Sequence, residues 1–397
     1  MKGKKNCWLL PEGIEELLPE PAARLEQLRR EILDLYRGWG YQLIIPPFVD
    51  YLDSLLTGTG HDLDLQTFKL IDQMSGRLLG LRADMTPQAA RIDAHSLQRE
   101  APSRLCYLGT VLHTRPDGFA GSRSPLQVGA ELFGHAGAES DVEILQLMVA
   151  TLGLTGIDDL YIDLGHVGIY RGLARDASLN IEQEAFLFDA LQRKAIPEIN
   201  EFLGTLDLST AQRERLAGLA TLNGDGDVLS RARELLTGSS DNVMVALDNL
   251  QHIADLASQR LPEVTLHFDL AELRGYQYQT GVVFAVFVAD RGQEIARGGR
   301  YDDIGKVFGV ARPATGFSTD LRTLMELGNR EWLPIPGGIL APAENDATLE
   351  EAIAALREAG EIVIRQLPGQ AGNVAETGCD RVLHREGSQW IVQSPGT

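Results

Sequence analysis

The chain has 397 residues, of which 44% are apolar, so it can bury a full hydrophobic core and is long enough for two or three domains. Its 36 Lys and Arg residues stand against 56 Asp and Glu residues, a formal net charge of −20 that repels polyanions unless a basic face is segregated. We therefore expect no nucleic-acid partner, although the acidity could also serve only to keep the protein soluble.

The first predicted element is an amphipathic helix over residues 21–38, because apolar residues recur there at helical spacing. Pro21 favours its start and Gly38 lies near its end. A β-prone run over residues 41–45 follows and stops at Pro46, which cannot donate a ladder hydrogen bond and suits a strand at a sheet edge.

Further strands are predicted wherever β-prone runs are bounded by Gly, Pro or Asp turns. These runs are residues 78–82, 104–112, 126–133, 160–164, 264–270 and 282–288. They indicate a mixed, mainly antiparallel sheet flanked by helices, that is, an α+β fold. No run approaches the roughly 20 apolar residues that span a bilayer, so we expect no membrane partner.

The pattern becomes helical between residues 171 and 260, which predicts an inserted helical subdomain. Its clearest helices are expected over residues 181–194, 210–220 and 241–259. A Pro- and Gly-rich linker near residue 334 then precedes a short α/β segment with strands at 339–341 and 361–366, a helix at 348–359, and two strands within 381–393. We expect a core over residues 1–330, with the insertion at 171–260, and a small C-terminal α/β domain over 331–397.

The cysteine and histidine residues indicate which kinds of covalent and metal chemistry the chain can support. Cys7, Cys106 and Cys379 are odd in number and widely separated, which argues against a disulfide framework and indicates a reducing cytoplasm. The sequence has no phosphate-binding P-loop and no G-x-S-x-G or H-E-x-x-H motif, and its eight His residues lack the spacing of a metal cluster. We therefore expect no metal and no cofactor.

Four segments carry candidate binding residues. Arg82, Asp84 and Thr86 follow a predicted strand and could hold an ammonium group, since a carboxylate accepts charge-assisted hydrogen bonds from an amine. Alternatively, Asp84 caps the helix expected to start at Pro87. On the strand over 126–133, alternation places the side chains of Gln127 and Glu131 on one face, where they could enter a pocket or simply face solvent.

The other two segments are rich in aromatic residues. Residues 274–281 combine Arg274 with Tyr276 and Tyr278, which suits a planar ligand that carries a carboxylate; an aromatic hairpin is the alternative. Residues 298–302 place Tyr301 after two glycines, and glycine permits close backbone approach to a pocket.

Taken in chain order, these segments resemble the catalytic core of histidyl-tRNA synthetases, a class II synthetase fold, over roughly residues 8–328. The resemblance implies that Asp84, Thr86 and Gln127 hold the α-amino group of histidine, that Glu131 meets its imidazole, and that Arg274 is the arginine of the first histidine motif.

By the same resemblance, Tyr278 and Tyr301 line the side-chain pocket, and Gln279 stands where a tyrosine is usual. The helix over 21–38 and the strand ending at Pro46 are similar to the dimer-forming first motif of the class.

The nucleotide motifs depart from the synthetase pattern. Residues 111–116 lack the Arg and Glu of the second class II motif, Thr323 stands where the third motif has an ATP-binding arginine, and Asp320 replaces a glycine. The segment after residue 332 is also short for an anticodon-binding domain. Losing these groups removes charge stabilisation that a phosphoryl-type transition state needs.

With these departures the chain resembles the paralogous family of ATP phosphoribosyltransferase regulatory subunits. That family implies a non-catalytic cytoplasmic protein, needed for the first step of histidine biosynthesis, that activates a short-form catalytic subunit and mediates feedback inhibition by histidine. Two alternatives remain: a divergent histidyl-tRNA synthetase-like ATP-dependent ligase, and a tRNA-binding protein.

Overall fold

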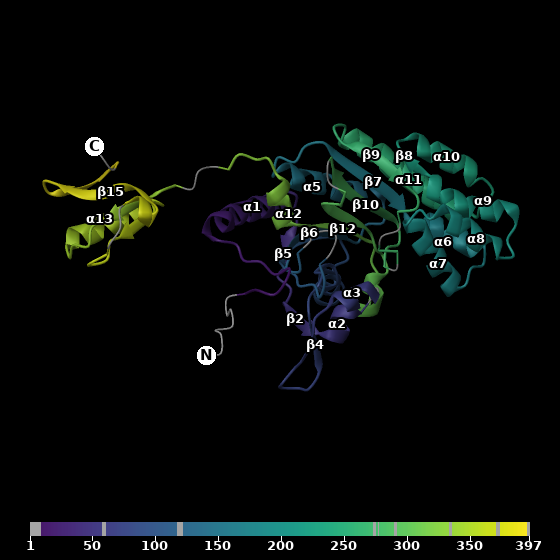
Figure 1. Cartoon of the computed structure of the whole chain (residues 1–397), viewed down its shortest axis with the longest axis horizontal. Helices are drawn as coiled ribbons and strands as arrows, with labels where there is room; N and C mark the ends of the chain where they lie inside the picture. The colour runs from purple at the N-terminus through teal and green to yellow at the C-terminus, as the bar shows by residue number, and fades with distance from the viewer. Residues whose placement is uncertain are drawn as a thin grey trace, which may run out of the picture. The chain divides into compact units, whose positions relative to one another are not determined.

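The computed structural model describes residues 9–57, 61–116, 122–272, 275–276, 278–289, 292–332, 336–370 and 374–394. The chain divides into two compact units, Met1–Arg330 and Glu331–Thr397 (Figure 1). Within the described residues, no helix combines the length and the apolar character that crossing a membrane requires.

The main sheet of the first unit contains nine strands among the described residues. In spatial order they are β1 (Gln42–Leu43), β5 (Ser103–Thr110), β6 (Leu126–Phe133), β12 (Ala314–Asp320), β11 (Ala296–Arg300), β10 (Val282–Val288), β7 (Leu160–His166), β9 (Thr265–Asp269) and β8 (Asn223–Gly224). Only β1 with β5 and β7 with β9 pair in parallel. The prediction of a mixed, mainly antiparallel sheet flanked by helices is confirmed.

Three helices pack together against this sheet: α1 (Pro19–Gly38), α5 (Ala138–Gly153) and α12 (Leu321–Leu327). Helix α1 buries one stripe completely, and the ring of Tyr36 meets the ring of Phe317 on β12 edge-on at 6.3 Å. The helix α4 (Thr86–Arg91), the π-helix η1 (Ile92–Leu97) and the 3-10 helix η3 (Ile304–Phe308) form a second cluster around Tyr107 and Tyr301.

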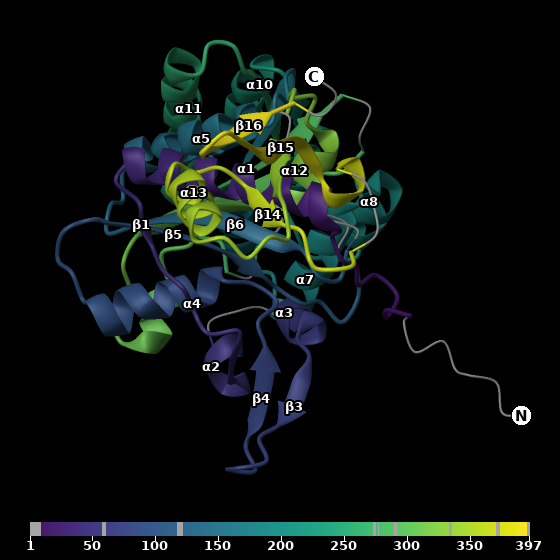
Figure 2. The same ribbon diagram turned by 90° about the vertical axis from the view of Figure 1, so that its left-hand side faces the viewer.

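A separate three-stranded sheet corrects the prediction for residues 78–82. There β4 (Leu78–Leu81) lies between β2 (Val49–Tyr51) and β3 (Lys69–Ile71), with α2 (Leu52–Leu56) and α3 (His61–Gln66) beside it (Figure 2). The strand predicted over 41–45 is also shorter, because only Gln42 and Leu43 pair with β5 before Pro46. A local β-prone run does not determine which sheet it joins.

Residues 171–260 are mainly helical, as predicted. The helices are α6 (Val167–Asp176), α7 (Ile181–Gln192), α8 (Ile196–Gly204), α9 (Thr210–Gly218), the 3-10 turn η2 (Leu219–Thr221), α10 (Asp227–Leu235) and α11 (Asp241–Arg260). Asn180 and Ser209 begin α7 and α9 with reciprocal capping boxes, which satisfy the first free backbone N–H groups. We refer to α6–α11 as the helical insertion.

The second unit is a small α/β domain. Its strands lie in the order β14 (Val363–Arg365), β13 (Gly338–Ala341), β15 (Cys379–Glu386) and β16 (Gln389–Gln393). Helix α13 (Ala347–Glu358) packs on the sheet, the 3-10 turn η4 (Ala375–Thr377) precedes β15, and Ile339, Leu349 and Leu383 are buried in the core.

Candidate functional site

The first unit contains a cavity of about 410 Å³. Strands β6 and β12 form its floor. The 83–87 segment, β11, helix α7 and residues 275, 276, 278 and 279 supply walls. On the floor Glu131 pairs with Gly316, and Gln127 pairs with Asp320. Four residues of a strand span roughly 13 Å, so these pairs mark two separate ends of the cavity.

Glu131 is 1% exposed and is the centre of the first end. Its Oε1 accepts from the hydroxyl of Tyr107 at 2.8 Å and from Thr86 Oγ1 at 3.0 Å, and its Oε2 accepts from the hydroxyl of Tyr301. Burial raises the pKa of the Glu131 carboxyl to about 8, against the opposing effect of the hydroxyl donors. We call Glu131, Tyr107, Thr86 and Tyr301 the carboxylate cluster.

Gly316 provides the space that Glu131 occupies. A Cβ atom on Gly316 would lie 1.6 Å from Glu131 Oε2 and 2.8 Å from the carbonyl oxygen of Ala130. The site therefore depends on a residue without a side chain, because a carboxylate and a methyl group cannot share that volume.

Asp84 and Gln127 form a hydrogen-bonded pair next to the carboxylate cluster. Gln127 Nε2 donates to Asp84 Oδ1 at 2.7 Å, and the backbone N–H of Met85 donates to Gln127 Oε1 at 3.0 Å. Asp84 Oδ1 also accepts from the backbone N–H of Thr86 at 3.1 Å, at the start of α4. Thus Asp84 lines the cavity and also satisfies a helix terminus, so the two interpretations made from the sequence are compatible.

Arg82 does not join this group, which corrects the expectation of an Arg–Asp–Thr trio. Its guanidinium donates to the carbonyl oxygens of Pro46 at 2.7 Å and Thr110 at 2.9 Å, and it lies 5.6 Å from the ring of Phe48. Side chains alternate along a strand, and Arg82 follows β4 with its side chain directed to the backbone rather than to the cavity.

We call residues 275, 276 and 278–281 the aromatic loop. Its side chains at the cavity differ in how far they are exposed. Tyr278 lines the cavity but is 38% exposed, which places it at the rim. Gln279 is 5% exposed, and its Oε1 is buried without a hydrogen-bond partner. Arg274 lies outside the described residues.

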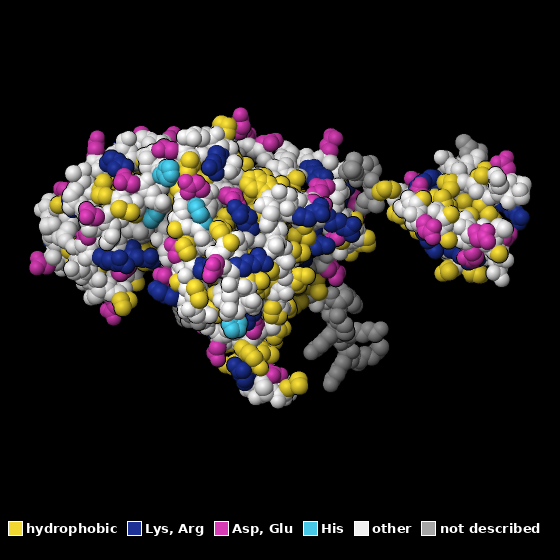
Figure 3. Space-filling model, turned by 180° about the vertical axis from the view of Figure 1, so that it is seen from behind, with side chains coloured by type: hydrophobic (Ala, Val, Ile, Leu, Met, Phe, Trp, Pro, Cys, Tyr) yellow, Lys and Arg dark blue, Asp and Glu magenta, His cyan; other side chains and the backbone are white. Residues whose placement is uncertain are grey.

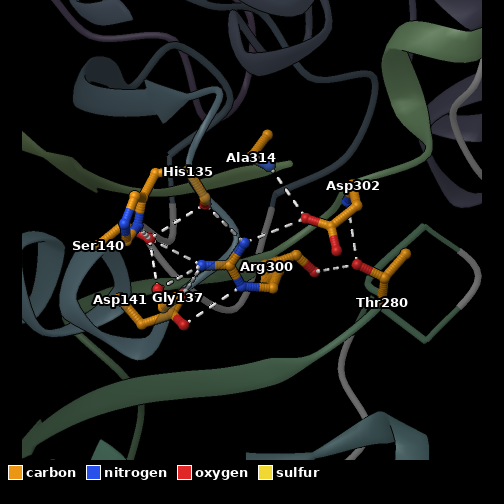
Figure 4. Close-up of polar contacts among 8 residues, drawn as sticks. All are labelled: His135, Gly137, Ser140, Asp141, Thr280, Arg300, Asp302 and Ala314. Atoms are coloured by element: carbon orange, nitrogen blue, oxygen red, sulfur yellow. Dashed lines mark hydrogen bonds and ion pairs between the residues drawn. The ribbon is translucent and has the colours of Figure 1, made fainter. Parts of the chain in front are cut away.

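Arg300, the residue before Tyr301, is the centre of a polar network (Figure 4). Its guanidinium pairs with the fully buried Asp141 at 3.0 Å, donates to Ser140 Oγ at 2.8 Å and pairs with Asp302 at 3.2 Å. The backbone N–H of Asp302 donates to Thr280 Oγ1 at 2.9 Å, which ties the aromatic loop to the same network. Arg300, which is buried, and Asp302, which is half-buried, are both multiply hydrogen-bonded on either side of Tyr301 and limit where its hydroxyl can lie.

The second end of the cavity has acidic and hydroxyl side chains. Asp320 Oδ2 accepts from the backbone N–H of Thr323 at 3.1 Å and from its Oγ1 at 2.9 Å, which caps α12. Burial raises the pKa of the Asp320 carboxyl. Among the described lining residues, the acids are Asp84, Glu131, Glu272 and Asp320, whereas Arg297 is the only Lys or Arg. This composition disfavours a triphosphate.

Sequence reasoning missed three parts of the site: Tyr107, Gly316 and helix α7. Tyr107 is fully buried and lies opposite Gly129 across β5 and β6, a relation that only strand register reveals. Gly316 offers no side-chain signal. Phe188 and Gln192 line the cavity from α7, although the helical pattern gave no sign that this helix borders the cavity.

Comparison with known proteins identifies the class of fold to which the first unit belongs. A family model described as histidyl-tRNA synthetase matches residues 13–324. A histidyl-tRNA synthetase structure from Nostoc sp. PCC 7120 has the same fold, with a TM-score of 0.75, 19% identity and coverage of 96% of this chain and 92% of that chain. The first unit is therefore a class II synthetase-like core of the histidyl type.

Closer relatives narrow the class. A second model, described as the ATP phosphoribosyltransferase subunit HisZ C-terminal domain, matches residues 336–393. ATP phosphoribosyltransferase regulatory subunits from Thioalkalivibrio sulfidiphilus and Alkalilimnicola ehrlichii are 62% and 56% identical over 98% of both chains. A Bacillus halodurans structure described as an ATP phosphoribosyltransferase regulatory subunit/histidyl-tRNA synthetase has a TM-score of 0.81 at 29% identity, covering 94% of this chain and 96% of that chain.

The chain belongs to the family of ATP phosphoribosyltransferase regulatory subunits, with a regulatory role in histidine biosynthesis. The family predicted from the sequence motifs is confirmed.

Proposed function

We propose that this chain performs no catalysis itself, that it activates a short-form catalytic subunit of ATP phosphoribosyltransferase, and that it carries the histidine site for feedback inhibition. The names of its relatives support a catalytic partner. The carboxylate cluster is the observation that carries the histidine assignment, because a buried carboxylate with hydroxyl donors and aromatic walls is complementary to an imidazole.

The ligand would lie with its charged groups near the cluster. Asp84, Gln127 and Thr86 offer acceptors for the α-amino group, Glu131 and Tyr301 face the imidazole, Tyr278 lies at the rim, and Arg274 is proposed as the carboxylate partner. The acidic second end supports a pocket for an amino acid rather than for ATP, since it offers little positive charge to a triphosphate.

Self-association is part of the proposal. The segment that ends at Pro46 and the small sheet expose apolar side chains, among them Ile45 at 86%, Ile71 at 67% and Met74 at 97%. Figure 3 shows hydrophobic side chains gathered at the lower part of the first unit, where this sheet projects. An apolar surface of this kind supports a two-fold contact between copies that includes α1 and β1.

The decisive experiment mixes the purified chain with the short-form catalytic subunit and follows phosphoribosyl transfer with and without histidine. The proposal expects no transfer by the chain alone, activation on mixing, and inhibition by histidine. Calorimetry with the isolated chain should detect histidine binding.

The ligase alternative makes a different prediction. A synthetase-like enzyme would exchange pyrophosphate into ATP in the presence of histidine, and a robust exchange signal from the chain alone would overturn the non-catalytic assignment. Stable tRNA retention at physiological salt would support the nucleic-acid alternative, which the net charge of −20 disfavours.

A further inference from the structure

The cavity has walls from two parts of the first unit. Gly275, Tyr276 and Gln279 border it from the aromatic loop, whereas Phe188 and Gln192 border it from α7 of the helical insertion. A ligand that touches both walls can favour one arrangement of the insertion relative to the sheet. The question is which contacts join the loop to the insertion.

Arg171 on α6 makes the first connection. Its Nη2 donates to the carbonyl oxygen of Tyr276 at 2.8 Å and to that of Gln279 at 3.2 Å. The guanidinium also lies 4.7 Å from the centroid of the Tyr276 ring. At the first residue of the same helix, the backbone N–H of Val167 donates to the carbonyl oxygen of Gly281 at 3.1 Å. The loop is therefore bound to α6 at Tyr276, Gln279 and Gly281.

Tyr276 makes the second connection. Its ring centroid lies 5.3 Å from that of Tyr170 on α6 and 5.2 Å from that of Phe188 on α7, and its hydroxyl donates to Glu184 on α7. Phe188 itself lines the cavity. The same tyrosine thus touches both helices, and α7 touches any ligand large enough to fill the cavity.

We propose that Arg171 and Tyr276 are positioning residues that join the aromatic loop to α6 and α7, so that occupancy of the cavity sets the position of the helical insertion. This inference rests on the proposed function, in which the ligand is histidine and the response is inhibition of a catalytic partner. We call the contacts of Arg171 and Tyr276 between the aromatic loop and the two helices the joint. It combines aromatic packing, a cation–π contact and backbone hydrogen bonds. Such packed contacts transmit small shifts because they are not continuously deformable.

The test separates binding from coupling. Arg171→Met removes the two hydrogen bonds to the loop and leaves the side chains of the cavity lining unchanged, and Arg175→Met, an exposed arginine one turn further along α6, is the matched control. For Arg171→Met we expect the histidine Kd of the isolated chain to change by less than about threefold, while half-maximal inhibition of the assembled complex needs about tenfold more histidine. The control should leave both values unchanged.

Hydrogen exchange gives a readout that needs no partner chain. Histidine should slow backbone exchange in α7 of the native chain and of Arg175→Met. Arg171→Met should keep only the part of this response that direct ligand contact with Phe188 and Gln192 gives. Glu184→Gln, with exposed Glu182→Gln as its control, serves as the second variant if Arg171→Met does not fold, and it should weaken the same response.

The outcomes distinguish the two proposals. If the native chain binds histidine and the complex is inhibited, yet Arg171→Met and Glu184→Gln retain full inhibition and full α7 protection, the joint is wrong and the proposed function stands. If the native chain binds no histidine, both are overturned.

Discussion

The two ends of the cavity share the same two strands, and each has a buried carboxyl group, but the two groups have different partners. Around Glu131 and Gly316 the side chains are buried, mutually hydrogen-bonded and fitted to one another. At the other end the carboxylate of Asp320 caps helix α12. The difference teaches that one pair of strands can support a closely fitted carboxylate cluster at one end and a helix cap at the other, since each end depends on its own few contacts.

The largest effect is expected from Gly316→Ala, which would place a methyl group on the Glu131 carboxylate. Overpacking of this kind costs about 1–3 kcal/mol of stability, and histidine binding should be lost. Gly153→Ala, at a position with open space on α5, should fold and bind normally. Urea unfolding and calorimetry measure both, and intact binding in Gly316→Ala would show that the carboxylate cluster is not the site.

Glu131→Gln keeps the approximate size of the side chain, prevents its ionisation when histidine binds, and replaces one oxygen acceptor by an NH2 donor. Loss of a charged hydrogen bond corresponds to about 1.5–3 kcal/mol, so the histidine Kd should rise roughly 10–100-fold. Asp320→Asn makes the equivalent change at the second end and should alter the histidine Kd little. Equal losses in the two variants would mean that the two ends do not act separately.

The pH dependence of stability should reveal the raised pKa of the buried Glu131 carboxyl group. Its pKa in the folded protein, about 8, exceeds the ordinary value of 4.5, so the folded state holds the proton more tightly. The stabilising contribution is present below pH 4.5 and is lost as pH rises through 8. The Tm of the native chain should therefore fall relative to that of Glu131→Gln between pH 5 and 9, and parallel curves would contradict the raised pKa.

The smallest effect tests the capping role of Asp320. Asp320→Ala should cost about 0.5–2 kcal/mol in unfolding free energy, whereas Asp320→Asn should cost less because asparagine also caps helices. Neither variant should bind ATP, since no arginine is restored at Thr323. ATP binding by Asp320→Asn alone would show that one carboxylate is sufficient to exclude the nucleotide.

Much of the architecture could be predicted from local patterns. The strands over 126–133 and 282–288 have the observed bounds, because Gly, Pro and polar residues delimit strongly β-prone runs. The run over 78–82 was assigned to the wrong sheet, since strand partners are set by contacts distant in sequence. For the site, the alternation that placed Gln127 and Glu131 on one face was sufficient to bring both into one cavity.

The sequence by itself determined the fold class, the family and the residue types available for binding, because these follow from periodicity and motif order. Only the tertiary structure decided what those residues do: it directs Arg82 into the backbone, places Tyr107 and Gly316 against Glu131, and brings α7 to the cavity. The reason is physical. Strand register and helix packing juxtapose residues far apart in the chain, and no local pattern encodes which buried groups will share one volume.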